Sequence, residues 1–387
     1  MKVTEVIIRR VPISRRGDWI FVQLKTDEGL VGLGEASQGG NDAETIRQIR
    51  QNVAPRVVGS DPCDVRTTAR KLYPLAQSQG RQAATAVSAV EQALWDLAGQ
   101  AFGQPVWKLL GGKQRDKIWV YANINRATGV EGVPGGNTGR SPEAFAANAK
   151  RAVEAGFRAV KLASFDGMPP LDRPEAIEAL ERGIACVFAV REAVGPEVQV
   201  LLDAHCHFTA QWAIRVAKRL EPTGLFWYED PVHRSDWEGL ARVRREIEQP
   251  VAAGEAFFGI EPFWRLFTGG GAGQEVGPLI DVAMPDVKHC GGLALLTRIG
   301  ELAEAAHVQV APHNPSGPVA QAATVQACAA LPSFTILEHA WGETDWRHTL
   351  VEPAEPLAEG YHQVPDSPGL GIRLNEAVMA EREKPLE

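Results

Sequence analysis

The chain has 387 residues, of which 44% are hydrophobic and 23% charged, and its formal net charge is −8 at pH 7. This length exceeds the usual size of one domain, so we expect two packed units. The negative charge argues against a nucleic-acid partner, which would need a basic face. The sequence contains neither the run of about 18 apolar residues that a membrane span needs nor a signal-peptide pattern. We therefore expect a cytoplasmic protein with no membrane partner.

The N-terminal part of the sequence predicts a small α+β unit over residues 1–115. Segments that alternate apolar and polar residues predict strands, and the turn Asp27-Glu28-Gly29 predicts a hairpin. Apolar residues at helical spacing predict helices further on. The expected strands are residues 3–10, 19–26 and 30–34, and the expected helices are residues 42–58 and 81–102.

Residues 116–350 repeat a unit of short apolar strand, loop and helix, which implies parallel strands joined by crossover helices. Eight such strands predict a closed (β/α)8 barrel of the TIM type. Residues 351–387 are rich in Pro and Gly and are expected to return to the first unit. The strand ends are placed at residues 121–123, 160–162, 201–203, 227–229, 253–255, 282–285, 310–312 and 337–338.

Three acidic residues end consecutive predicted strands: Asp203, Glu229 and Glu255, at equal intervals of 26 residues. They should rise side by side at the C-terminal rim of the barrel, where barrel enzymes keep their active sites. Without a cation these carboxylates would repel one another and their pKa values would climb. Oxygen ligands suit Mg²⁺, so we expect one Mg²⁺ per active site. The alternative is three unrelated acids that act as helix caps or surface ion pairs.

Two histidines follow predicted strands near these acids. His313 follows the seventh strand and Asp286 the sixth, so the aspartate can hydrogen-bond the imidazole and raise its basicity. His205 lies two residues beyond Asp203, and if the strand continues there, both side chains face the same way. The sequence therefore predicts a His-Asp dyad and a second histidine beside the metal site.

Glu338, at the end of the eighth strand, would face the metal site across the barrel mouth. If it is protonated, or paired with Lys161 of the second strand, it could orient a substrate carboxylate. A rim ion pair is the alternative for both residues. Asn123 and Trp19 are added as expected substrate contacts.

Short motifs recur in a fixed order over nearly the whole chain. They are Thr26-Asp27-Glu28-Gly29 with Gly34-Glu35, Gln92-Ala93-Leu94-Trp95-Asp96, Glu229-Asp230-Pro231-Val232, Ala252-Ala253-Gly254-Glu255, Pro285-Asp286-Val287 with Gly291-Gly292, and Ala311-Pro312-His313 with Gly317-Pro318. Together they resemble the mandelate racemase subgroup of the enolase superfamily, and most closely its galactonate dehydratases. The resemblance implies a capping domain on a modified (β/α)7β barrel. We also expect a homo-oligomer.

The resemblance also implies roles for the predicted site residues. The family's racemases usually carry Lys-x-Lys at the second strand, where this chain reads Lys161-Leu162-Ala163, and its cycloisomerases place a lysine where Asp286 stands. Both absences favour a dehydratase. By the resemblance, Asp203, Glu229 and Glu255 match the metal ligands, His313 with Asp286 the base, His205 the general acid and Glu338 the stabiliser of the enolate.

The implied reaction is Mg²⁺-dependent dehydration of a sugar acid, such as an aldonate, to a 2-keto-3-deoxy acid by removal of the C2 proton and loss of the 3-hydroxyl. An epimerase, racemase or cycloisomerase acting through the same enediolate, and a non-catalytic sugar-acid-binding paralogue, stay open as alternatives. By analogy, cap loops near residues 14–19 and 73–81 would select the substrate. The sequence departs from the galactonate enzymes in those loops and around residues 341–346.

Overall fold

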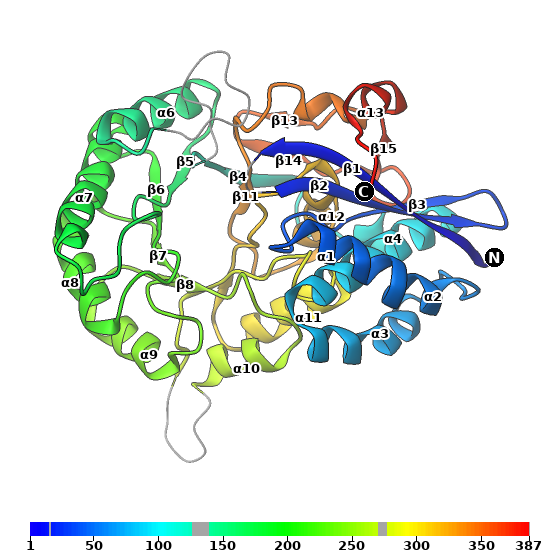
Figure 1. The fold of residues 1–387 in the computed structure, drawn as a ribbon, viewed down its shortest axis with the longest axis horizontal. Helices are drawn as coiled ribbons and strands as arrows, with labels where there is room; N and C mark the ends of the chain where they lie inside the picture. Colours follow the sequence, from blue (N-terminus) through cyan, green and yellow to red (C-terminus); the bar gives the residue numbers. More distant parts are fainter. Residues whose placement is uncertain (15–16, 126–138, 270–276, 387) are drawn as a thin grey trace.

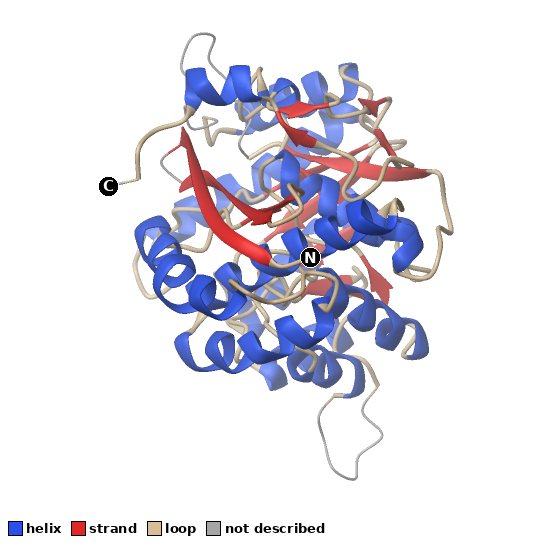
Figure 2. Ribbon diagram, turned by 90° about the vertical axis from the view of Figure 1, so that its right-hand side faces the viewer, coloured by secondary structure: helices blue, strands red, loops and turns tan. Residues whose placement is uncertain are grey.

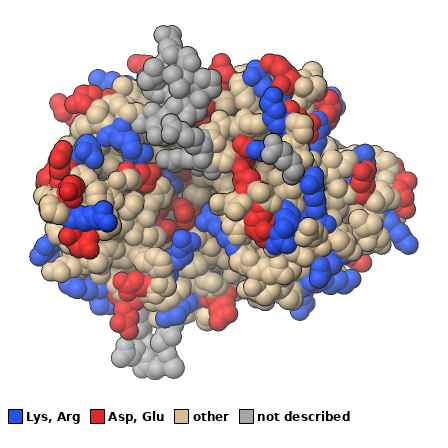
Figure 3. All heavy atoms as spheres, viewed as in Figure 1, with Lys and Arg blue, Asp and Glu red and all other residues tan. Residues whose placement is uncertain are grey.

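The computed structural model describes residues 1–14, 17–125, 139–269 and 277–386. A barrel surrounded by helices and a smaller unit of strands and helices lie side by side, on the left and right of Figure 1. Figure 2 views the molecule from the side of the smaller unit. In the face shown in Figure 3, acidic and basic side chains are interspersed rather than gathered into one basic area. None of the helices in the described ranges combines the length and the apolar character needed to cross a bilayer.

The smaller unit, called the cap below, is an antiparallel sheet of three strands, in the order β1-β2-β3, packed against helices. Gly34 of β3 lets the helix α4 approach closely, because a Cβ there would lie 2.0 Å from the carbonyl oxygen of Ala89. The elements are β1 (Val3–Ser14), β2 (Gly17–Thr26), β3 (Val31–Glu35), α1 (Asp42–Arg47), the π-helix η1 (Gln48–Val53), α2 (Ala54–Val57), α3 (Val65–Gln79), α4 (Arg81–Phe102) and α5 (Val106–Leu109).

The sequence analysis did not predict the helix α3. Its prediction of a cap loop at residues 73–81 is wrong. α3 continues to Gln79 and α4 begins at Arg81, so only Gly80, with a φ of 80°, separates two helices. The buried residues of α3 do recur at helical spacing. Pro74 lies inside the helix. Because proline usually ends a helix, the helical spacing of the apolar residues was not interpreted as one continuous helix.

The larger unit is a barrel of parallel strands whose described part has eight strands and seven intervening helices, the expected (β/α)7β arrangement. Strands β4 to β10 pair in chain order, β11 pairs with β4, and Phe334 before β11 bridges to Val310, which closes the barrel. Its elements are β4 (Lys117–Asn123), α6 (Pro142–Glu154), β5 (Ala159–Leu162), α7 (Glu175–Val194), β6 (Gln199–Asp203), α8 (Ala210–Leu220) with η2 (Glu221–Thr223), β7 (Trp227–Glu229), α9 (Trp237–Glu246), β8 (Val251–Ala253), α10 (Glu261–Thr268), β9 (Val282–Ala283), α11 (Leu293–Ala305), β10 (Gln309–Val310), α12 (Pro318–Ala330) and β11 (Leu337–His339).

Side chains fill the interior of the barrel. Tyr121 and Trp227 meet edge to face there, with ring centroids 5.6 Å apart. The space below the predicted active site is therefore a packed floor rather than a channel. The buried residues of this inner cluster are Tyr121, Ala159, Leu201, Trp227, Ala252, Val282, Met284, Ala311 and Ile336.

The C-terminal segment contacts both units. Its strand β14 pairs antiparallel with the start of β4, and the backbone N–H of Lys384 donates to the carbonyl of Arg10 in β1 at 3.0 Å. The expected return to the cap is thus accompanied by pairing with the barrel, and Figure 1 shows α13 beside β1. The elements are η3 (Arg347–Thr349), β12 (Val351–Glu352), β13 (Leu357–Ala358), β14 (Tyr361–Gln363), β15 (Arg373–Leu374) and α13 (Glu376–Arg382).

Two buried carboxylates of the cap accept backbone N–H groups at the starts of barrel helices. Glu35 accepts from Gly317 at 2.7 Å and Ala320 at 2.8 Å, at the start of α12. Glu91 accepts from Leu293 at 2.7 Å and Ala294 at 2.9 Å, at the start of α11. The first N–H groups of a helix lack partners within the helix, so carboxyl oxygens that accept from them hold the cap on the barrel.

Candidate active site

The structure brings Asp203, Glu229 and Glu255 together at the rim of the barrel. Asp203 and Glu229 are direct register partners at the ends of β6 and β7, and Glu255 follows β8 by two residues. Each offers one carboxylate oxygen within 4.8 Å of those of the other two. Asp203 and Glu229 are buried and Glu255 is partly buried. The arrangement arises because parallel strands of a barrel end at the same rim.

The electrostatics of these acids call for a compensating cation. Burial, and then the charge of Asp203, raise the pKa of Glu229 well above its usual range, although Lys161 acts in the opposite direction. The Oε2 atom of Glu255 is buried, and Nε2 of His313 lies 3.0 Å from it, which leaves acceptor capacity on that oxygen. Carboxylate oxygens with an unused acceptor position fit a hard divalent cation.

His313 lies between two acids. Its Nδ1 is 2.7 Å from Oδ2 of Asp286, and its Nε2 is 3.0 Å from Oε2 of Glu255. Burial alone would lower the pKa of His313, but the charges of Glu255 and Glu338 and the hydrogen bond to Asp286 outweigh it and raise the pKa to about 10. The ring is therefore oriented by one carboxylate and faces the three-acid cluster with its other nitrogen.

His205 reaches Asp203, but not by the route that the sequence suggested. The strand β6 ends at Asp203, and His205 adopts a left-handed backbone conformation with a φ of 43°. The expectation that strand alternation continues to His205 is therefore wrong. A turn instead places Nε2 of His205 2.8 Å from Oδ2 of Asp203, and Nδ1 contacts a carboxylate oxygen of Asp166.

Glu338, Lys161 and Asn123 form one buried group. Lys161 Nζ lies 2.8 Å from Glu229 Oε1 and 3.2 Å from Glu338 Oε1, and Asn123 Nδ2 donates to Glu338 Oε1 at 2.7 Å. Burial opposes ionisation of Glu338, but Lys161 and His313 outweigh it and lower its pKa. Of the two states considered for Glu338, the structure favours the ionised carboxylate paired with Lys161.

Trp19 is not brought to this group by any contact among the described residues. It is 1% exposed and meets Trp346 edge to face, with ring centroids 5.6 Å apart. The guanidinium of Arg347 lies 5.5 Å from the centroid of its ring. The indole therefore packs at the junction of the cap with the segment after β11, and its expected contact with substrate stays a prediction.

Sequence analysis missed several residues that contact the histidines or their partners, among them Asp166 and Lys288. Asp166, in the loop after β5, contacts Nδ1 of His205. Lys288 Nζ lies 2.7 and 2.6 Å from the two carboxylate oxygens of Asp286 and is fully buried. Despite burial, this lysine lowers the pKa of Asp286 well below its usual range. The one available signal for Asp166 was its position after the strand that carries Lys161. The signal for Lys288 was its position two residues after Asp286, a predicted site residue.

Comparisons with known proteins agree with this architecture. Residues 9–111 match the mandelate racemase / muconate lactonizing enzyme N-terminal domain, and residues 144–378 match the enolase C-terminal domain-like family. A D-gluconate dehydratase of Thermoproteus tenax is 34% identical, over 93% of this chain and 69% of its own. A D-galactonate dehydratase family member of Streptomyces bingchenggensis is 34% identical, over 94% of this chain and 89% of its own.

A solved structure is similar over the whole length. The crystal structure of a mandelate racemase/muconate lactonizing enzyme-like protein from Rubrobacter xylanophilus has a TM-score of 0.88 and 34% sequence identity to this chain. The alignment covers 99% of this chain and 98% of the other. The likeness therefore includes the cap, the barrel and the C-terminal segment together.

Proposed function

The chain belongs to the enolase superfamily, with the N-terminal domain of its mandelate racemase and muconate lactonizing enzymes, and on that premise we propose that it is a Mg²⁺-dependent sugar-acid dehydratase. The observation that carries the proposal is the convergence of three carboxylates at the rim with His313 and His205 beside them. Relatives named as dehydratases of gluconate and galactonate support the substrate class.

Asp203, Glu229 and Glu255 would hold the ion. When bound, Mg²⁺ supplies positive charge for the substrate carboxylate, where negative charge develops as C2 loses its proton. Asn123 and Lys161 keep Glu338 ionised and fixed in position. In this proposal Glu338 orients the substrate carboxylate, while the packed barrel floor excludes water from below.

The two histidines stand on opposite sides of the barrel. His205 follows β6 and His313 follows β10, four strands apart in a closed ring of eight. Asp286 fixes the tautomer of His313, so that Nε2 is the atom that takes the C2 proton. His205 then gives a proton to the 3-hydroxyl, which leaves as water. Ketonisation of the remaining enol gives the 2-keto-3-deoxy acid.

A library of aldonic and related sugar acids, incubated with the protein and Mg²⁺ and assayed for 2-keto-3-deoxy acids, tests this function. We expect product from at least one aldonate and none after removal of the metal. Exchange of the C2 hydrogen in D₂O without loss of water would instead support an epimerase or racemase. Neither product nor exchange with any member of the library would support a binding protein without catalysis.

The proposal also includes the domain boundaries, the cellular location and the oligomeric state of the protein. The division into a cap of residues 1–115, a barrel of residues 116–350 and a returning segment of residues 351–387 follows the element order. The cytoplasmic location and the homo-oligomer stay predictions, and light scattering in solution tests the second.

A further inference from the structure

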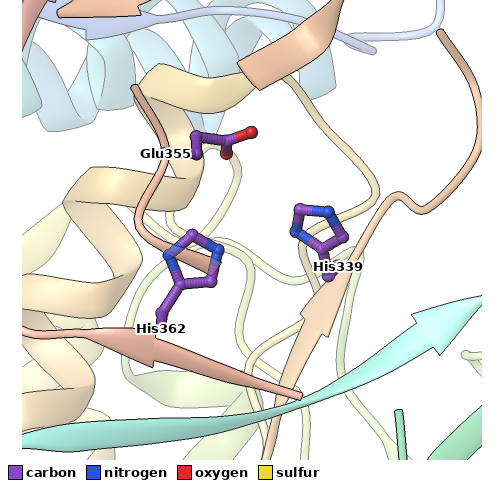
Figure 4. A group of neighbouring side chains, drawn as sticks. All are labelled: His339, Glu355 and His362. Carbon is purple, nitrogen blue, oxygen red and sulfur yellow. The ribbon is translucent and has the colours of Figure 1, made fainter. Parts of the chain in front are cut away.

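A second group of possible metal ligands lies outside the barrel, among His339, Glu355 and His362. The three side chains come from three different segments, and Figure 4 shows them around one shared space. His339 is in β11, His362 in β14, and Glu355 lies between β12 and β13. Because successive side chains of a strand face opposite ways, His339 points away from the barrel interior while its neighbour Glu338 faces the active site.

Both imidazoles of this group have a buried nitrogen without a partner. Nδ1 of His339 and Nε2 of His362 make no hydrogen bond within the described residues, and the two residues are 4% and 3% exposed. Leaving a polar atom buried and unpaired costs about 1–3 kcal/mol. Two such nitrogens on facing rings, with centroids 5.6 Å apart, point to a ligand that accepts lone pairs from both.

Glu355 completes the group with a carboxylate that is already oriented. Arg347 donates to it through Nε at 2.9 Å and Nη2 at 3.0 Å, one bond to each oxygen. Each carboxylate oxygen can accept more than one bond, so this contact leaves acceptor capacity on both. Hydrogen bonds of this kind commonly fix the carboxylate ligands of metal sites.

We propose that His339 Nδ1, His362 Nε2 and the carboxylate of Glu355 bind a divalent transition-metal ion of the zinc class. Two imidazoles with one carboxylate are ligands that Zn²⁺ and Co²⁺ prefer, whereas Mg²⁺ prefers oxygen ligands alone. Each of the three residues offers one ligand atom, and these atoms lie within 4.8 Å of one another. Ligands at about 2 Å from a tetrahedral ion lie about 3.3 Å apart. The side chains therefore need only to close around the ion.

The ion would act as a structural tie rather than in the reaction. It would join β14 and the segment between β12 and β13 to β11, the strand that carries Glu338. Without an ion, His339 and His362 are two neutral histidines in a packed junction. Phe157 stacks on His339 there, with ring centroids 6.0 Å apart. These two states differ in metal content and in metal-dependent stability, and both are measurable.

The direct test is titration of chelator-treated protein with Co²⁺ in a large excess of Mg²⁺, followed by the visible absorption of the ion. The excess Mg²⁺ occupies the three-carboxylate site, so Co²⁺ reports the histidine site. We expect one Co²⁺ per chain with the intense absorption of a four-coordinate site, and a rise of the melting temperature. Absence of Co²⁺ binding by the wild-type protein would overturn the proposal without reference to any variant.

Variants then locate the ion. His362→Asn should lose the Co²⁺ spectrum and the metal-dependent rise in melting temperature, while His307→Asn, a change at an exposed histidine, should keep both. Glu229→Gln removes a ligand of the carboxylate site and should leave the Co²⁺ spectrum intact. A spectrum that survives His362→Asn, or that disappears with Glu229→Gln, would contradict the assignment. The second result would place the ion in the proposed active site.

Discussion

The Nδ1 atom of His313 lies 2.7 Å from Oδ2 of Asp286, across the gap between two neighbouring strands of the barrel. This contact directs the other ring nitrogen toward the three carboxylates of the rim. Lys288 donates to both oxygens of the same aspartate. The orientation of the imidazole is therefore fixed by the fold before any substrate binds.

Replacing His313 with Asn should abolish turnover. The amide can still hydrogen-bond Asp286, but it cannot take a proton from carbon. General bases contribute about 10²–10⁴-fold to rates, so a loss of at least this size is expected in kcat. Exchange of the C2 hydrogen with D₂O should disappear as well. Product formation at the wild-type rate would refute His313 as the base.

Replacing His205 with Asn should separate the two halves of the reaction. Loss of water should stop because no group protonates the 3-hydroxyl, whereas exchange of the C2 hydrogen, which depends on His313, should persist. Proton NMR of the substrate in D₂O measures both. If the rates of C2 hydrogen exchange and of dehydration decrease to the same extent, His205 does not act only in the loss of the 3-hydroxyl.

The carboxylate of Asp166 contacts Nδ1 of His205 and should position it. Asp166→Asn is expected to lower kcat less than His205→Asn does, with little change in KM. It should also lower the pKa of His205, which that carboxylate and Asp203 raise despite burial. A titration of the ring signals by NMR compares the two proteins. An unchanged titration and an unchanged kcat would remove Asp166 from the site.

Binding of Mg²⁺ should lower the pKa of His313. Without metal, the acids around the ring outweigh burial and raise this pKa to about 10. A cation held by Glu255 offsets the largest of these charges. The folded pKa exceeds the value of 6.5 for an unperturbed histidine, so protonation of His313 stabilises the metal-free protein. This contribution is fully present below about pH 6.5 and is lost as the pH rises through about 10. An NMR titration with and without Mg²⁺ tests the shift, and identical curves would argue against metal binding beside His313.

The buried carboxyl of Glu91 should make the cap more stable in mild acid. Burial raises its pKa from 4.5 to about 7, in spite of the hydrogen bonds from Ala294 and Trp95. A raised pKa means that the protonated form favours folding, so this contribution is fully present below about pH 4.5 and is lost as the pH rises through about 7. The difference corresponds to about 3 kcal/mol.

Denaturant unfolding of wild type and Glu91→Gln between pH 4.5 and 8 measures this effect. The free energy of unfolding of wild type relative to the variant should rise as the pH falls from 8 to 4.5. Glu238→Gln, at an exposed position of α9, should run parallel to wild type. A constant difference between wild type and Glu91→Gln would show that Glu91 does not titrate in this range.

The rim acids could be predicted because Asp203 and Glu229 end apolar strands and Glu255 follows one by two residues, and parallel strands of a barrel end together. The position of His205 beside Asp203 was expected for the wrong reason, since a left-handed turn rather than a continued strand places it. Asp166 lies in a loop, where no periodic pattern marks a functional side chain. His339 and His362 meet only because β14 pairs with β4, a long-range contact that local patterns do not contain.

The location of the bound dication is the point on which the mechanism depends. Anomalous diffraction from crystals grown with Mn²⁺ in place of Mg²⁺ would reveal it directly. We predict a peak among Asp203, Glu229 and Glu255, with His313 and His205 on either side. The absence of a peak there at saturating Mn²⁺ would contradict the proposed chemistry.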